Sequence, residues 1–210
     1  MTLVEVLAVL AAVVILLALY FPSRPRQMQR APWMQCVNNL RQIGLATLVW
    51  GEEHDDKFPT AVSPINGGAM EYTSGPNAWK NFQVMSNQLH MPKVLFCPAE
   101  TDPHRFMATN FDYLRNLNLS FFVGIDANET LPNAILSGDR NITNSMPLNN
   151  ALLELTTSRP AGWNSEMHNS YGNILFADGH VSQLTITKLK RAGANSGLPT
   201  NRLQMPVLAP

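Results

Sequence analysis

The stretch MTLVEVLAVLAAVVILLALYFP, residues 1–22, decides the architecture of the amino-terminal part of this chain. From Val6 to Phe21 every residue is apolar or Tyr, and Glu5 is the one side chain in residues 1–21 that carries a charge at neutral pH. As a helix, about 21 residues rising ~1.5 Å each span ~31 Å, close to the thickness of the hydrocarbon core of a bilayer. The run therefore predicts an apolar helix that lies in a membrane or in the core of an assembly.

A signal peptide and a plain membrane anchor are the simpler interpretations of this run. A signal peptide has a basic start, a shorter apolar region and a small-residue cleavage site, whereas this run has no basic start and ends in Tyr20-Phe21-Pro22. An anchor fits better than a signal peptide. In a plain anchor, Glu5 would lie at the membrane interface, because a carboxylate deeper in hydrocarbon is costly.

Three prolines separate the apolar run from a second periodic segment. Pro22, Pro25 and Pro32 lack an amide hydrogen and disfavour helix in the residue before them, so we expect an irregular link over residues 22–31. Apolar residues then recur at helical spacing, which predicts an amphipathic helix over residues 32–53. The members of this stripe are Trp33, Val37, Leu40, Ile43, Gly44, Thr47 and Leu48.

The amino terminus resembles the mature start of a type IV pilin or a type II secretion pseudopilin. The resemblance rests on Thr2, on Glu5 ahead of an apolar helix, and on Pro22 at its end; Met1 stands where that family usually has a methylated Phe. It implies that a prepilin peptidase removes a short basic leader. It also implies that the Glu5 carboxylate neutralises the amino-terminal ammonium when subunits pack, which is physically sensible because opposite charges offset each other's desolvation.

Four further elements are similar to one subgroup of this family, the subgroup with a carboxyl-terminal H-x9-DG module. In chain order they are Cys36–Ala46 (CVNNLRQIGLA), Leu95–Pro98 (LFCP), Ile135–Asn141 (ILSGDRN), and His168 followed by Asp178-Gly179. The resemblance implies a pilin-like fold and a filament of identical subunits. It also implies an inner-membrane precursor and an extracellular or periplasmic filament, and leaves room for a Ca2+ ion because some major pseudopilins bind one.

The expected architecture is α+β: a long amino-terminal helix packed on a small antiparallel sheet. Residues 1–54 form the helical part, residues 55–192 a globular head, and residues 193–210 an extended tail rich in Gly, Pro and Asn. Residues 173–186 read as a hairpin in which Asp178 and Gly179 form a two-residue type I′ turn. Strands are also expected at Val94–Cys97, Leu119–Val123 and Ala134–Leu136, and helices at Asn77–His90 and Thr187–Ala192.

Cys36 and Cys97 are the two cysteines of the chain. In an exported protein they most simply form one disulfide; the alternative is two buried free thiols. A nucleophilic cysteine would need an accessible, electropositive cleft, and Cys36 falls beside the apolar stripe. We therefore expect no catalysis, and expect His168 to brace the hairpin segment by hydrogen bonding.

Charge and ligand spacing exclude several other classes. Lys plus Arg and Asp plus Glu both number 15, so no nucleic-acid footprint is visible. There is no close Cys or His pair of the kind that binds zinc and no EF-hand spacing among the scattered aspartates, so no metal is expected. The resemblance implies a structural filament subunit; the alternative is a membrane-anchored minor pseudopilin that binds partners in secretion.

Overall fold

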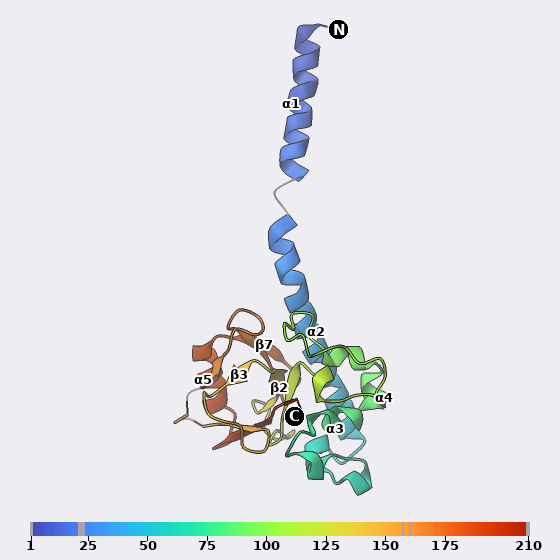
Figure 1. Cartoon of the computed structure of the whole chain (residues 1–210), viewed down its shortest axis with the longest axis vertical. Coiled ribbons are helices and arrows are strands. Elements are labelled where there is room, and N and C mark those ends of the chain that lie inside the picture. Colours follow the sequence, from blue (N-terminus) through green and yellow to red (C-terminus); the bar gives the residue numbers. More distant parts are fainter. Residues whose placement is uncertain (1, 21–23, 157, 160, 209–210) are drawn as a thin grey trace.

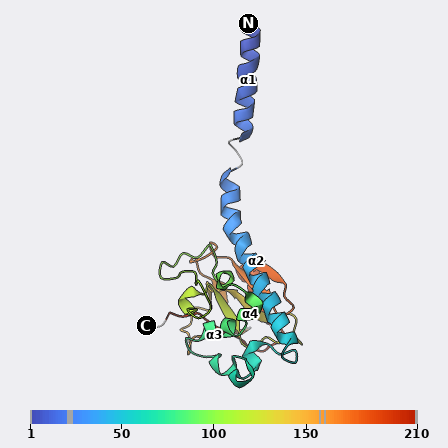
Figure 2. The same cartoon turned by 90° about the vertical axis from the view of Figure 1, so that its right-hand side faces the viewer.

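The computed structural model describes residues 2–20, 24–156, 158–159 and 161–208. Two helices come first: α1 (Leu3–Tyr20) and α2 (Arg24–Glu52). Both views show α1 standing clear of the folded body formed by the residues after α2, which we call the head, while the end of α2 lies along that body (Figures 1 and 2). Within the described residues, no helix combines the length and apolar character needed to cross a membrane.

The prolines interrupt helix less than the sequence predicts. The irregular link expected over residues 22–31 is wrong for its second part, because α2 already begins at Arg24 and contains Pro32. Pro25 lies in the first turn, where backbone amides have no intrahelical partner in any case. Pro32 costs about 3 kcal/mol, which the packing of the following turns on the head offsets. Pro22 lies outside the described residues.

The second half of α2 packs on the head through the predicted stripe. Val37, Leu40 and Ile43 are buried, which confirms the helical periodicity. Gly44 allows close approach to strand β6 (Gly172–Phe176): a Cβ at this position would lie 2.7 Å from the Leu175 side chain. The second half of α2 is therefore packed against the sheet.

The head is built on a six-stranded antiparallel sheet with the order β4-β8-β1-β2-β6-β7, and β3 pairs with β5 in a second, two-stranded sheet. The expectation of an α+β chain with an amino-terminal helix and an antiparallel sheet is confirmed, and the sheet is larger than expected. The strands are β1 (Phe121–Gly124), β2 (Ile135–Asp139), β3 (Ile142–Thr143), β4 (Leu152–Leu155), β5 (Gly162–Trp163), β6 (Gly172–Phe176), β7 (Val181–Leu184) and β8 (Asn201–Gln204).

Short helices fill the connections. The helix expected at Asn77–His90 is split in two, and the strand expected at Val94–Cys97 is wrong, because Pro92 begins a 3-10 turn there. The helix expected at Thr187–Ala192 is confirmed as α5. The elements are η1 (Pro59–Ala61), η2 (Pro64–Asn66), η3 (Met70–Tyr72), α3 (Ala78–Gln83), α4 (Ser86–Leu89), η4 (Pro92–Leu95), η5 (Asn116–Asn118) and α5 (Ile186–Ala194).

Four residues of the expected extended tail, Asn201–Gln204, instead form a strand of the sheet. Strand β8 lies between β4 and β1, and it pairs antiparallel with both. Leu203 is fully buried, and so is Gln204, whose amide donates to the carbonyls of Tyr72 and Gly75. A strand of four residues is too short to be recognised in a segment rich in turn formers. The strand can be assigned only once the strands that pair with it are known.

The hairpin is confirmed, but its turn differs from the predicted one. Phe176 and His180 are linked by a backbone hydrogen bond of 3.0 Å, and Gly179 donates to the Phe176 carbonyl. The loop therefore has three residues, with Gly179 alone in the left-handed region at φ +86°. A type I turn followed by a left-handed glycine is the usual three-residue connection, so Asp178 does not take the positive φ of a type I′ turn.

Successive residues of the sheet strands point to opposite faces and pack in two separate apolar clusters. On β6, Leu175 packs with α2 residues such as Leu40 and Ile43. Ile174 points to the other cluster, with Phe122 and with Leu189 of α5. The two faces of the sheet are thus covered by α2 on one side and by α5 with the short strands on the other (Figure 1).

Candidate functional site

Two parts of the molecule stand out as candidates for function: the surface of α1 and a polar cluster inside the head. From residue 2 to residue 17 every side chain is exposed. Most of these side chains are large and apolar, on all sides of the helix: Leu3, Val4, Val6, Leu7, Val9, Leu10, Val13, Val14, Ile15, Leu16 and Leu17. An exposed apolar surface of this extent marks an interaction site.

Glu5 caps the start of α1. The Thr2 amide donates to Glu5 Oε2 over 2.8 Å, and a carboxylate in the first turn also suits the helix dipole. The resemblance assigns a role in assembly to four residues: Met1, Thr2, Glu5 and Pro22. Of these, Thr2 and Glu5 are thus in contact. The other two members, Met1 and Pro22, lie outside the described residues.

Inside the head, the second candidate begins at the disulfide. Cys36 and Cys97 are bonded, with Cα atoms 5.1 Å apart and a separation of 61 positions in sequence. The bond joins α2 to the segment after η4, which confirms the disulfide expected from the sequence. Asn39 adds a parallel link, because its side-chain amide donates to the Phe96 carbonyl over 2.9 Å.

A buried carboxylate, Asp139, lies at the end of β2. Asn173 donates to its Oδ2 from both the backbone and the side-chain amide, over 2.7 and 2.8 Å. The same Asn173 accepts a hydrogen bond from Trp33 of α2 over 3.0 Å. Burial raises the pKa of Asp139 to about 7, although the bonds from Asn173 work in the opposite direction.

His168 lies between this carboxylate and the disulfide. Its Nε2 is 3.4 Å from Cys97 Sγ and 3.4 Å from Asp139 Oδ2. Burial lowers the pKa of the imidazole, so the ring is neutral at physiological pH. The bracing role predicted for His168 fits these contacts, but the partners are Cys97 and Asp139 and not the hairpin turn.

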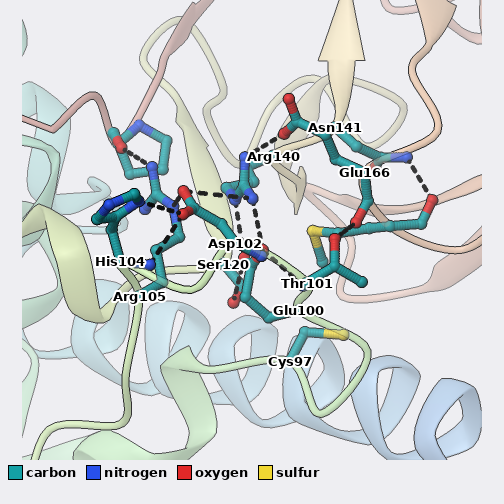
Figure 3. Close-up of polar contacts among 12 residues, drawn as sticks. Cys97, Glu100, Thr101, Asp102, His104, Arg105, Ser120, Arg140, Asn141 and Glu166 are labelled. Carbon is teal, nitrogen blue, oxygen red and sulfur yellow. Dashed lines mark hydrogen bonds and ion pairs between the residues drawn. The ribbon is translucent and has the colours of Figure 1, made fainter.

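Arg140, the next residue along the chain, forms an ion-pair network with Glu100 and Glu166 (Figure 3). It contacts Glu100 through Nε at 2.8 Å and through Nη2, and Glu166 through Nη1 at 2.6 Å. Ser120 donates to Glu100 over 3.1 Å. Burial acts to raise the pKa of Glu100, but the hydrogen bonds and charge of Arg140 outweigh it and leave that pKa below the usual value.

Asn141 fixes the loop that carries His168. Its side-chain amide donates to the carbonyls of Asn164, Met167 and Tyr171. Within that loop, His168, Asn169 and Ser170 all have positive φ, a conformation that costs non-glycine residues free energy. Asn141 therefore holds a strained turn in place.

Asp178 and Gly179 serve a separate contact. The Asp178 carboxylate accepts from the His180 amide over 3.0 Å and contacts its ring nitrogen at 2.5 Å. Gly179 lies close to Leu48 of α2. The H-x9-DG element is thus divided: His168 belongs to the buried cluster, and Asp178-Gly179 to the hairpin turn.

The chemistry available in this cluster is that of a structural centre. The two sulfurs are joined and fully buried, which leaves no thiolate to act as a nucleophile. Of the described residues, only Cys36, Cys97 and His168 bring three metal-binding atoms within 4.8 Å. Two of the scattered aspartates form ion pairs: Asp102 pairs with Arg105, and Asp126 with Arg202.

Sequence reasoning missed Glu100, Asn173 and the roles of Arg140 and Asn141. The GDRN stretch was visible, but nothing in it indicates that its Asp, Arg and Asn each face a different partner. Glu100 and Asn173 lie on other segments, 40 and 33 residues from Arg140 in the chain, and only the folded structure brings them together. Comparison with models of protein families, with curated proteins and with solved structures found no match to this chain.

Proposed function

We propose that this chain is the structural subunit of a helical filament of the type IV pilus or pseudopilus kind, assembled by packing of its α1 helices. The observation that carries the proposal is the exposed apolar surface of α1. Burying one Leu or Val side chain gains about 1.5–3 kcal/mol. Several neighbours packed around each α1 would bury these side chains on all sides of the helix.

Glu5 has a defined part in this proposal. In a single chain it accepts a hydrogen bond from Thr2, and one carboxylate oxygen remains for another partner. In the filament, that carboxylate would face the amino-terminal ammonium of a neighbouring subunit. Two opposite charges in an apolar core offset much of the desolvation that each would suffer alone.

The head supplies a rigid outer body. A disulfide suits an exported protein, and the Arg140 network and the buried Asp139 tie the sheet to its loops. Before assembly the apolar helix would hold the precursor at the inner membrane, where a prepilin peptidase and the assembly machinery would act on it. The head would lie outside the cytoplasm.

Two matched substitutions test the proposal. Leu10 of α1 and Ile65 of the head are both exposed, 56% and 94%, so Leu10→Glu and Ile65→Glu both add one charge to an exposed apolar site. We expect Leu10→Glu to abolish filaments in negative-stain images and in sedimentation assays, and Ile65→Glu to leave them unchanged. Filaments of normal number and length from Leu10→Glu would refute packing through α1.

A further inference from the structure

Three asparagines of the chain begin a triplet Asn-x-Ser or Asn-x-Thr, which is the acceptor pattern for an N-linked glycan. They are Asn118, Asn128 and Asn141. Triplets of this kind arise by chance in a chain rich in asparagine, so the sequence alone does not distinguish them. The structure does, because a glycan can extend only from a side-chain nitrogen that reaches solvent.

Asn118 and Asn141 use their side-chain nitrogens inside the head. Asn118 is 2% exposed, and its Nδ2 donates to the Phe106 carbonyl over 2.9 Å. Asn141 is fully buried, and its Nδ2 donates to three carbonyls of the loop that carries His168. A sugar bonded to either nitrogen would break these hydrogen bonds and would have to enter the packed interior. Neither triplet can therefore carry a glycan in a folded head.

Asn128 lies in the loop that connects β1 to β2. It is partly exposed, and the next two residues of its triplet, Glu129 and Thr130, are exposed. The amide and the hydroxyl of Thr130 both donate to Asn128 Oδ1, over 3.1 and 2.6 Å. Among the described residues, Asn128 Nδ2 makes one hydrogen bond, of 3.4 Å, to the Asp126 carbonyl, although an amide nitrogen has two hydrogens to donate. The nitrogen that would bear the sugar is thus the less occupied end of the side-chain amide.

Contacts on both sides of the triplet anchor this loop to the head. Before the triplet, Asp126 accepts from the Arg202 amide over 2.8 Å and forms an ion pair with the Arg202 guanidinium, and Ala127 is buried. After the triplet, Leu131 packs against the core of the head. The loop therefore presents the side chains of its triplet from a rigid support, which is the usual arrangement of functional loops.

We propose that Asn128 carries an N-linked glycan in the native protein, added by a membrane-bound transferase from a lipid-linked sugar diphosphate. The new bond joins Asn128 Nδ2 to the anomeric carbon of the sugar. The bond between that carbon and the diphosphate oxygen breaks, the lipid diphosphate leaves with the bonding electrons, and one amide proton passes to a base. This inference rests on the proposed function only in requiring that the head lies outside the cytoplasm.

Mass spectrometry of the full chain isolated from its native source tests the inference. Trypsin leaves Asn118 and Asn128 together on the peptide of residues 116–140, so fragmentation of that peptide has to assign the site. We expect the mass of one or more sugars on Asn128, and no added mass on Asn118 or Asn141.

Variants produced in the same source separate the acceptor from the fold of the loop. Asn128→Gln and Thr130→Val should both lose the added mass completely, because the first removes the acceptor and the second removes the hydroxyl of the triplet. Thr130→Ser keeps the hydroxyl and should keep the added mass. Asn133→Gln is the matched control, since Asn133 is an exposed asparagine of the same loop outside any triplet, and it should leave the added mass unchanged.

An Asn128 without added mass in the native chain overturns the inference. So does a glycan that persists in Asn128→Gln or Thr130→Val, or one that is found on Asn118 or Asn141. Electron microscopy of the same samples distinguishes this failure from failure of the filament proposal. Normal filaments with an unmodified Asn128 would refute the glycan alone, whereas a chain glycosylated at Asn128 that forms no filaments would refute the assembly alone.

Discussion

Helix α1 and the head differ in which side chains they expose. The α1 helix exposes apolar side chains along its length, whereas the head buries a network of charged side chains. Leu3 and Val4 at the start of α1 are more than 70% exposed, while Glu100 in the head is 1% exposed beside Arg140. The groups that attract attention in the sequence, namely the cysteines and the GDRN and H-x9-DG elements, hold the head together. Helix α1 has none of these motifs, and it is the part of the chain with a large exposed apolar surface.

This contrast separates two kinds of experiment. A change in α1 should alter assembly and leave the melting of the head unchanged. A change in the polar cluster should alter the stability of the head first, and assembly only through loss of folded subunits. The predictions below test that separation, in order of the size of the expected effect.

The largest effect is expected at Glu5. Glu5→Gln keeps an oxygen that can accept the hydrogen bond from Thr2 but removes the charge, and Glu5→Ala removes both. If the charge pairs with a neighbouring ammonium, both variants lose filaments in electron micrographs while the head melts at the wild-type temperature. Normal assembly by Glu5→Gln with failure of Glu5→Ala would show that Glu5 acts as a helix cap and not through its charge.

Arg140 should be the most costly single side chain of the head to remove. Arg140→Met leaves Glu100 buried without its partner, and breaking a buried pair in this way costs about 3–5 kcal/mol. The control is Arg159→Met, because Arg159 and its partner Glu154 are half exposed and such pairs contribute about 0–1 kcal/mol. Urea unfolding measures both; equal losses would contradict the contrast between buried and exposed pairs.

Loss of the disulfide should cost nearly as much. For two cysteines separated by 61 positions in sequence, the chain-entropy estimate is ~4 kcal/mol, and real bridges often give less. Cys36→Ala with Cys97→Ala should lower the free energy of unfolding accordingly, without changing the exposed surface of α1. Mass spectrometry without reductant checks the premise, which two alkylatable thiols in native protein would refute.

Asp139 should give the head a pH dependence of stability. Its pKa is raised from 3.8 in the unfolded chain to about 7 in the folded head, so the folded form holds the proton more tightly. This contribution is fully present below the unfolded pKa and is lost as pH rises to 7, a change of roughly 4 kcal/mol at most.

Asp139→Asn removes that slope because its amide does not titrate. Relative to the wild-type oxidised head, this variant should therefore gain stability between pH 4 and 7, as measured by urea unfolding at each pH. Asp178→Asn is the matched control, since the Asp178 side chain is 41% exposed. A constant difference between wild type and Asp139→Asn across this range would exclude the raised pKa.

The smallest effect is expected at the hairpin turn. Gly179 has φ +86° and a Cβ there would lie 3.2 Å from Leu48, so Gly179→Ala should cost roughly 1–2 kcal/mol. At Gly193 of α5 a Cβ meets nothing within 4 Å, and Gly193→Ala should be neutral or stabilising, by up to about 1 kcal/mol. Thermal melts compare the stability of the two variants. An equal change in melting temperature would show that the positive φ at Gly179 contributes nothing to the cost of the substitution.

The sequence predicted the elements whose signal is local. The stripe from Val37 to Thr47 repeats at helical spacing, and Asp-Gly between two runs of strand formers marks the hairpin around Gly179. The turn type was missed because Phe176 and His180 pair across it, and that pairing adds a third residue to the loop.

Elements that depend on distant partners were not predictable in this way. Strand β8 has only four residues and exists because β4 and β1 lie on either side of it. Pro32 stays in a helix because the following turns pack on the head. The same holds for the polar cluster, in which Asp139, His168 and Glu100 come from three separate segments.

A cryo-electron microscopy map of native material is the most direct test of assembly through the α1 helices. We predict filaments in which α1 helices from several subunits form the core, with each Glu5 facing the amino terminus of a neighbour and the heads on the outside. A map that shows single particles, or a filament with α1 on its outer surface and heads in contact at the axis, would contradict the account.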